Sequence, residues 1–540
     1  MAVSIIREEE FTFPPDQRPI VPGSPARPPH PRGRRYLYGL IGVLVGITSG
    51  LGGALVQVNT SYLQGALGAS ATQIQWIPTV YVMVYVSMNL LLVRFRQQFG
   101  LRRYALIGLT AFCLVTAAHT LVHGITGAIF IHAVAGFATA PLLALSVFYL
   151  MAAMPPGNAL RGPVLALSIL QVPAPMARLF PTEVLALDQW KTLYLFELGL
   201  GLLCLSAVAI IRLPPSERSK VFQPLDFVTY PLIAIGMALL VAVIGLGRYE
   251  WWTDRAWLGW ALAAAIPLLT AAAYIEFYRA RPLVDLRWLR REHLFRFGLV
   301  IIVLRIAAAE QSAIAFGLLN TLGIITTNLR PLSFALFGAA VAGAITAALL
   351  FRPDRILMLG AGAFLLIAVS ALIDSHTTNL TRAPQFYATQ MMISFATSLA
   401  VGPSLLFGLT RVVSAGGAPL PSFLVLLSIV QNVGNLIGLS ALGTFQIISE
   451  KAASVALIGR VQAFDAVVQA RISAGGGGEA GVAALQRAMS REANVLAFGN
   501  SFALVAVLAA VAAAYLIVEV AFARYRISYP RRTPAQRSPA

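Results

Sequence analysis

The chain has 540 residues, of which 58% are hydrophobic and only 11% are charged. A soluble domain carries about 25% charged residues, so this composition excludes a soluble globular protein and indicates a polytopic membrane protein. The formal net charge of +18 sits in short segments between apolar runs and not on a basic face with interleaved aromatic residues, which excludes nucleic-acid binding. The lipid bilayer is the acidic partner that this charge suits.

The chain begins with a polar, proline-rich segment, "PPDQRPIVPGSPARPPHPRGRR". Such a composition buries too little apolar surface to fold, and it does not resemble a signal peptide. We expect residues 1–35 to form a disordered cytoplasmic tail, and residues 525–540 to form a second cytoplasmic tail.

Apolar runs long enough to span a bilayer follow one another from residue 37 onward. A spanning helix needs about 20 mostly apolar residues. Fourteen runs meet this length: 37–58, 74–93, 104–123, 127–151, 162–180, 193–212, 227–247, 257–278, 296–318, 332–351, 355–373, 385–409, 420–446 and 495–520. The first and fifth are interrupted by glycine or proline. The sequence therefore predicts an all-α polytopic membrane protein with about 14 transmembrane helices.

The basic residues predict the orientation of these helices. Clusters such as "RFRQQFGLRR", "RLPPSERSK" and "YRARPLVDLRWLRREHLFR" all fall on one side when the runs alternate across the bilayer. Cytoplasmic loops carry the excess of Lys and Arg. Both termini are therefore expected in the cytoplasm.

The order of the runs suggests two related halves. "GFATAPLLAL" in the fourth run and "SFATSLAVGPSLLFGL" in the twelfth share Phe-Ala-Thr followed by a proline, and internal repeats are common in secondary transporters. We expect an N-terminal six-helix bundle at 36–212, two inserted helices at 226–278 and a C-terminal six-helix bundle at 293–524. The second bundle contains a helical periplasmic loop, 447–494, which is either a solvated cap or a docking surface.

Motifs for enzymatic chemistry are missing from the sequence. No lysine lies in a Gly-Lys-Ser/Thr phosphate loop, and neither HExxH nor Gly-x-Ser-x-Gly occurs. The two cysteines, Cys113 and Cys204, lie in separate apolar runs and cannot form a disulfide framework. We expect no enzymatic activity, no cofactor and no metal.

Two charges interrupt the run "IIVLRIAAAEQSAIAFG". Each costs about 2.5–3.5 kcal/mol at the centre of a bilayer, and Arg305 lies roughly 13 Å along a helix from Arg296, near the midplane. Five residues separate Arg305 from Glu310, about 140° around a helix, so the two do not face each other. They are either buried charges that lock neighbouring helices or groups that couple protons or bind substrate.

A few other polar side chains lie in apolar runs. Glu197 in "LYLFELGLG" is an interfacial carboxylate or a proton carrier, and His132 in "IFIHAVAG" is a packing residue or a proton relay. Four amide side chains are substrate-cavity candidates, although interhelical hydrogen bonding also explains them: Gln57, Asn59, Gln431 and Asn432.

Three segments show a family resemblance. "QVNTSYLQGALGASATQIQWIPTVYVMVYVSMNLLLVRFRQQFGLRRY", "DQWKTLYLFELGLG" and "RPLVDLRWLRREHLFRFGL" resemble the major facilitator superfamily, in particular the fourteen-span EmrB/QacA-like drug:proton antiporters. The resemblance covers essentially residues 36–525.

This resemblance implies a proton-coupled exporter of small amphipathic or aromatic toxic compounds in a bacterial inner membrane. It works by alternating access, with protons and the small-molecule substrate as its partners. Relatives often work with a periplasmic adaptor and an outer-membrane channel, and the 447–494 loop is the candidate contact. An uptake symporter of the same fold is the alternative within transport. A non-transporting membrane enzyme or scaffold is the alternative of another class.

The cytoplasmic gating loop of the family is only partly present. Val93 and Gln97 stand where its first Gly and its Asp are usual. Four residues of the loop remain: Arg94, Gly100, Arg102 and Arg103. The span-five antiporter motif survives as "QVPAPMARLF", which keeps Pro173 and Pro175 and includes Arg178 but has no glycine.

The usual coupling residues are also replaced. The common span-one Asp falls at Gly52, and the span-four Arg falls at His132. Proton coupling is therefore expected at Glu310, Glu197 or His132. Burial favours the protonated form of a carboxylate and a nearby cation favours the charged form, so Glu310 with Arg305 as its modulator is the leading candidate.

Overall fold

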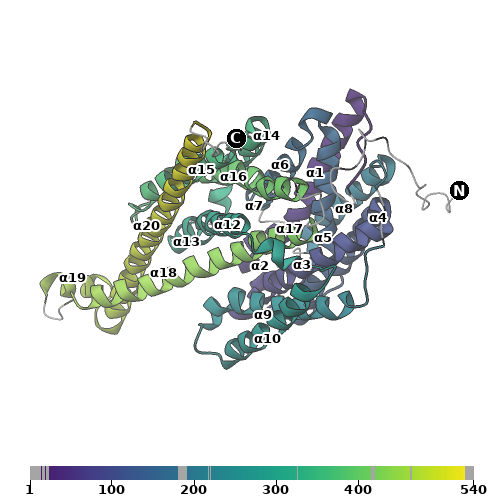
Figure 1. Cartoon of the computed structure of the whole chain (residues 1–540). Coiled ribbons are helices and arrows are strands. Elements are labelled where there is room, and N and C mark those ends of the chain that lie inside the picture. The colour runs from purple at the N-terminus through teal and green to yellow at the C-terminus, as the bar shows by residue number, and fades with distance from the viewer. Residues whose placement is uncertain are drawn as a thin grey trace.

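The computed structural model describes residues 24–180, 191–216, 220–324, 326–414, 420–461 and 465–528, together with Pro14, Gln17, Pro19 and Arg218. In these residues the chain is helical, and the pairing of Pro25 with Ser216 is the one bridge between extended segments. The predicted all-α architecture is confirmed (Figure 1).

The first half contains α1 (Arg32–Val58), α2 (Thr60–Ala66), α3 (Ala71–Phe99), α4 (Leu101–His119), α5 (Ile125–Ala153), α6 (Arg161–Ile169), α7 (Pro173–Ala177) and α8 (Lys191–Ile210). The next two helices are α9 (Asp226–Glu250) and α10 (Ala256–Tyr278). The second half contains α11 (Leu286–Leu289), α12 (Glu292–Glu310), η5 (Gln311–Ala315), α13 (Phe316–Thr321), α14 (Arg330–Leu350), α15 (Ile356–Asp374), α16 (Tyr387–Ser414), α17 (Leu420–Ser428), η9 (Ile429–Val433), α18 (Gly434–Ile458), α19 (Ala466–Ala474) and α20 (Gly478–Ser528). Short 3₁₀ turns η3 (Pro156–Asn158), η6 (Thr326–Leu329), η7 (Pro353–Arg355) and η8 (Ala383–Phe386) connect some of them.

Thirteen helices in the described part of the chain are long and apolar enough to cross a membrane. They coincide with thirteen of the fourteen predicted runs, which makes the protein a multi-pass membrane protein. The exception is the fifth run, 162–180, which is divided between the short helices α6 and α7.

Proline explains why the fifth run is not one helix. Pro173 has no N–H to donate to the carbonyl of Ile169. Instead, the backbone N–H of Val172 donates a hydrogen bond to Ile169 O at 2.9 Å, and Gln171 N–H donates to Ser168 O at 3.1 Å. The tighter i→i−3 bonds end α6, and α7 begins at Pro173.

The predicted tail is partly ordered, which corrects that expectation. Residues 24–31 lie against the segment after α8, where Ala26 N–H donates to Pro215 O at 3.0 Å and Pro25 pairs with Ser216. Ser24 and Ala26 are buried. Backbone pairing with a second proline-rich segment supplies the partners that the composition alone does not reveal. Helix α1 begins at Arg32, and residues 529–540 of the second tail lie outside the described residues.

Helix packing produces two bundles with separate apolar cores. One core joins α1, α3, α4, α5 and α8, and the other joins α12, α14, α15, α16 and α20. The bundles meet where α6 packs on α14 and α16, and where α3 packs on α17 and η9. Helices α9 and α10 pack on each other, and α9 packs against α3 and α18 (Figure 1).

The two ends of the bundle differ. We call the end where α3 meets α4 the Arg94 end, and the end where α4 meets α5 the His119 end. At the His119 end, α18 continues to Ile458, beyond the predicted boundary at 446, and α19 packs on α20. Helix α20 has 51 residues, roughly 76 Å at 1.5 Å per residue. The C-terminal part of the predicted 447–494 loop, from Gly478 onward, is therefore part of α20, and α18, α19 and α20 together form a helical projection (Figure 1).

Candidate functional site

A cavity of about 800 Å³ lies between the two halves. Residues of α1, α3, α5, α7 and α8 line one side, and residues of α12, η5, α13, α16 and α18 line the other. The lining extends from Gln57 and Gln75 near the His119 end to Arg96 near the Arg94 end. A concave space of this size suits a drug-sized molecule, and its position at the interface of two bundles is where transporters bind their substrates.

Three of the four predicted cavity amides line this space: Gln57, Gln431 and Asn432. The fourth, Asn59, does not line it. Asn59 is buried at the end of α1, and its Nδ2 donates to the carbonyl of Leu55 at 2.9 Å. A polar side chain at the end of a spanning helix can satisfy its own backbone in this way, which sequence position does not reveal.

Two of the helices that the C-terminal half contributes to the cavity region are each interrupted by one π-helical turn. Helix α12 passes through η5 before α13, and α17 passes through η9 before α18. π-turns occur as single insertions in α-helices, often at functional sites. Here η5 brings Gln311 and η9 brings Gln431 and Asn432 into the lining of the cavity.

Glu197 of α8 is the one carboxylate among the cavity-lining residues that the structure describes. It is 7% exposed and packs directly on α1 at Gly52. A Cβ atom placed on Gly52 would overlap Glu197 Oε1. The glycine therefore makes room for the carboxylate, and a larger residue at position 52 would displace it.

Two histidines and a tyrosine form a cluster beside Glu197. Tyr194 lies one helical turn from Glu197, and its hydroxyl is 3.2 Å from His132 Nε2. The rings of His119 and Tyr194 stack with centroids 4.4 Å apart, and the centroids of His119 and His132 lie 4.7 Å apart. All four side chains line the cavity. The cluster lies between the end of α4 and the part of α8 that carries Glu197, and histidine is a side chain that can exchange protons.

Arg305 and Arg178 lie where the two halves face each other. Arg305 Nη1 donates to Gln171 Oε1 at 3.3 Å, which links α12 to the segment between α6 and α7. Arg178 follows α7, and its guanidinium lies 3.7 Å from the ring centroid of Phe316 in α13. Both arginines line the cavity. In the sequence, Arg178 is notable only as part of the span-five motif. Its proximity to Phe316 results from tertiary packing, which the motif does not predict.

Glu310 lies outside the cavity and is fully buried. Its Oε1 accepts a hydrogen bond from Gln390 Nε2 at 3.0 Å, and the same amide donates to Asp374 Oδ2 at 2.9 Å. Gln311 connects this group to the cavity, because its Nε2 donates to Gln390 O at 3.2 Å. No hydrogen bond or ion pair among the described residues joins Arg305 to Glu310. The expected modulation of Glu310 by Arg305 thus has no contact to carry it.

Replacing Gln390 with leucine tests this buried group. Gln390→Leu removes the one amide that serves both carboxylates, and an unsatisfied buried polar group costs about 1–3 kcal/mol. We expect a lower midpoint of thermal unfolding for the purified protein in detergent, followed by tryptophan fluorescence. Gln57→Leu is the matched control, because Gln57 is exposed and its loss strands no partner. An unchanged midpoint in Gln390→Leu would show that the three side chains do not support one another.

The gating-loop residue Arg94 donates hydrogen bonds to both segments that connect α9 and α10 to the rest of the chain. Its Nη1 donates to Val221 O at 2.6 Å, just before α9, and its Nη2 donates to Pro282 O at 2.9 Å, just after α10. Gly100 joins α3 to α4 with φ +87, a backbone conformation that favours glycine. The other loop residues, Arg102 and Arg103, follow it in α4 and do not line the cavity.

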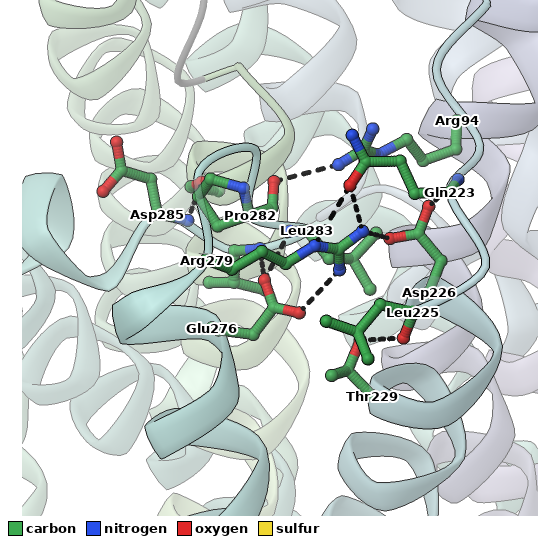
Figure 2. A network of polar contacts seen from close by, with 12 residues as sticks. Arg94, Gln223, Leu225, Asp226, Thr229, Glu276, Arg279, Pro282, Leu283 and Asp285 are labelled. Carbon is green, nitrogen blue, oxygen red and sulfur yellow. Dashed lines mark hydrogen bonds and ion pairs between the residues drawn. The ribbon is translucent and has the colours of Figure 1, made fainter.

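Arg279 is the centre of a buried ionic network beside Arg94 (Figure 2). Its Nη2 contacts Asp226 Oδ1 at 2.6 Å, and its Nη1 contacts Glu276 Oε1 at 3.1 Å. Gln223 Oε1 accepts from the same guanidinium at 2.7 Å. These side chains tie α9 to α10 at the Arg94 end, and no sequence pattern predicts their pairing.

The network continues into the second half. Glu276 Oε2 also accepts a hydrogen bond from the backbone of Val284 at 3.1 Å, and Asp285 N–H donates to Ser422 Oγ of α17 at 2.6 Å. Together with Arg94, these contacts connect α3, the inserted pair and α17 at one end of the cavity. Pro173 and Pro175, the predicted span-five prolines, are buried in α7, and Pro173 lines the cavity against Gly50 of α1.

Comparison with known proteins places this architecture. No family model matches the sequence. A peptide transporter with bound sulfate aligns with a TM-score of 0.56 at 12% identity, covering 93% of this chain and 97% of that one. A proton:xylose symporter of the major facilitator superfamily aligns with a TM-score of 0.54 at 12% identity, covering 90% and 96%. A human organic anion transporter aligns with a TM-score of 0.52 at 12% identity, covering 89% and 100%. The chain therefore has the major-facilitator fold.

One curated relative is similar in sequence. A probable actinorhodin transporter from Streptomyces coelicolor is 24% identical over 356 residues, which are 61% of this chain and 59% of that protein. The chain thus matches about three fifths of the length of that relative. The proteins that this chain resembles in fold and in sequence are transporters.

Proposed function

We propose that the protein is a proton-coupled secondary transporter that exports small amphipathic or aromatic compounds across a bacterial inner membrane by alternating access. The observation that carries this proposal is Glu197, a buried carboxylate in the wall of a cavity that both halves share. An ionisable group inside a membrane bundle marks a substrate or proton pathway. The similarity to a probable actinorhodin transporter from Streptomyces coelicolor supports a transport function.

In this mechanism, protons reach Glu197 from the His119 end through His119, His132 and Tyr194. Binding of a proton removes the charge of the carboxylate, and its release restores it, so the two conformations of the bundle differ in proton affinity. The network around Arg94 and Arg279 closes the opposite end when the cavity faces away from it. Export follows because the proton and the substrate use the same cavity in opposite directions.

Inverted membrane vesicles test this function. With a proton gradient that makes the vesicle lumen acidic, so that protons flow outward, we expect vesicles that contain the protein to accumulate a fluorescent aromatic substrate, and we expect a protonophore to abolish the accumulation. Vesicles without the protein are the control. Gradient-driven loss of substrate from the lumen would show an uptake symporter. The absence of any proton-dependent movement across a panel of aromatic compounds would contradict coupled transport.

The helical projection is the surface that we assign to a periplasmic adaptor, which an outer-membrane channel would follow. Its support is apolar exposure: Val455, Ile458, Val467 and Val482 are all more than half exposed. These side chains lie on α18, α19 and the start of α20, in the segment predicted as the 447–494 loop. Exposed apolar side chains in a solvated segment are typical of a partner surface.

A further inference from the structure

The charges of the cavity are strongly unbalanced. Four arginines line it, Arg96, Arg178, Arg248 and Arg305, against the single carboxylate of Glu197. None of the four forms an ion pair with a carboxylate in the part of the chain that the structure describes. Their hydrogen bonds go to neutral groups, as when Arg248 Nη1 donates to Leu439 O at 3.4 Å. Burying cations without counterions is costly, so this cavity is suited to receive negative charge.

Arg305 has an unused donor close to the interface of the halves, and Arg178 lies near the same interface. Arg305 is 9% exposed, and its Nε has no hydrogen-bond partner. Its Nη1 is held by Gln171, whose own Nε2 also lacks a partner. The guanidinium carbon of Arg178 lies 3.7 Å from the ring centroid of Phe316, and the guanidinium carries a rigid fork of N–H donors. A carboxylate accepts from such a fork in a bidentate arrangement.

Gln431 gives a second, independent sign of a ligand. It is 8% exposed, yet neither its Nε2 nor its Oε1 has a hydrogen-bond partner in the described structure. It lies on the π-turn η9, next to Gly434, and a Cβ on Gly434 would lie 3.4 Å from Arg305 Cβ. A buried amide without partners is destabilising unless something binds it. The amide and Arg305 thus flank the same part of the cavity.

Aromatic rings complete the lining. Phe148, Phe316, Tyr81, Tyr85 and Tyr194 all face the cavity, and Tyr81 stacks on Tyr85 with ring centroids 5.7 Å apart. Such rings bind planar apolar ligands. The combination of a cationic centre with aromatic walls selects for a ring system that carries an acidic group.

We propose that the cavity binds small aromatic organic anions, with the acidic group on Arg305 and Arg178 and the polar edge of the ring system on Gln431. This proposal rests on the proposed transport function and names its substrate class. An organic cation of the same shape meets four like charges in the cavity, which disfavour its binding.

Two probes with one ring system and opposite charge test the proposal. The probes are 1-naphthoate and 1-naphthylmethylammonium, titrated calorimetrically into the purified protein in detergent without a proton gradient. We expect naphthoate to bind at least about tenfold more tightly than the cation, which corresponds to about 1.4 kcal/mol. Equal affinities, or tighter binding of the cation, would overturn the proposal.

Variants locate the site. Arg305→Gln and Arg178→Gln are each expected to weaken naphthoate binding by about tenfold or more, since a hydrogen bond to a charged group contributes about 1.5–3 kcal/mol. Arg305→Lys retains the charge and is expected to weaken binding less than Arg305→Gln does. Arg255→Gln is the control, because the Arg255 side chain is 67% exposed and pairs with Glu250 outside the cavity. Wild-type affinity in both Arg305→Gln and Arg178→Gln would refute the assignment.

The failure of this inference and the failure of the proposed function give different results. Binding of naphthoate without any proton-driven movement in inverted vesicles would leave the anion site intact and refute coupled export. Proton-driven export of the cation, without binding of naphthoate, would support coupled export and refute the anion site. Thermal unfolding midpoints of the variants, compared with the wild type, show whether a loss of binding reflects a loss of fold.

Discussion

Glu197→Gln is expected to abolish proton-driven export. The amide has nearly the same shape as the carboxylate but cannot bind and release a proton, so a gradient no longer drives the transport cycle. Substrate exchange between the two faces of a proteoliposome needs no net proton movement, and we expect it to persist. The measurement compares gradient-driven accumulation with counterflow exchange in the same proteoliposomes. Glu519→Gln is the control, because the Glu519 side chain is 38% exposed and pairs with Arg296 outside the cavity.

The contact between Glu197 and Gly52 makes this prediction more specific. Gly52→Asp alone would force two carboxylates into one space, because even a Cβ at position 52 overlaps Glu197 Oε1, and we expect an inactive protein. In the double variant Gly52→Asp, Glu197→Gly, the acid comes from α1 in place of α8 and occupies the vacated volume. Proton-driven export is then expected to recover at least about tenfold over Glu197→Gly, a change worth about 1.4 kcal/mol in the barrier.

Two outcomes would contradict the role of Glu197. Gradient-driven accumulation at the wild-type level in Glu197→Gln would show that another group carries the proton. Loss of counterflow exchange together with coupled export would show a structural or substrate-binding role instead. In either case Glu310, which shares the amide of Gln390 with Asp374, becomes the next residue to test.

The spans were predictable because each spanning helix must satisfy its backbone within one segment, so an apolar run of sufficient length is itself a strong signal. The fifth run shows where this signal fails. Its composition is apolar enough, but Pro173 removes a hydrogen bond, and α6 and α7 each pack separately against the second half. The prediction that residues 24–31 are disordered failed for a different reason. Their backbone partners, Pro215 and Ser216, are distant in sequence, so the local composition does not reveal them.

The site was predictable residue by residue but not as an arrangement. Intramembrane charges stand out in the sequence, and Glu197, Arg305 and His132 all line the cavity. Which groups meet is decided by helix rotation, which one sequence does not encode visibly. For this reason, the Glu310 side chain accepts a hydrogen bond from Gln390 and not from Arg305. The absence of an acid at Gly52 was visible in the sequence, but the position of the Glu197 carboxylate beside this glycine appears only when the two helices are packed together.

Arg279→Gln is expected to produce the largest loss of stability. The Arg279 side chain is 5% exposed and contacts Asp226 and Glu276, whose side chains are 2% and 1% exposed. Removing one partner of a buried ionic group leaves the others uncompensated and costs about 3–5 kcal/mol. We expect a much lower yield of folded protein and a lower unfolding midpoint in detergent. Arg279→Lys retains the charge but loses the fork that reaches both acids, so its loss should be intermediate.

The same charge change at the surface provides the comparison. Arg255 pairs with Glu250 at 3.4 Å and is 67% exposed, and an exposed ion pair contributes at most about 1 kcal/mol, so Arg255→Gln should unfold near the wild-type midpoint. Neutralising the acids together with the arginine, in Asp226→Asn, Glu276→Gln, Arg279→Gln, should recover stability because no buried charge is then left alone. An equal, small effect of Arg279→Gln and Arg255→Gln would mean that water reaches this network and that the other contacts at the Arg94 end, such as those of Arg94 with Val221 and Pro282, hold it together.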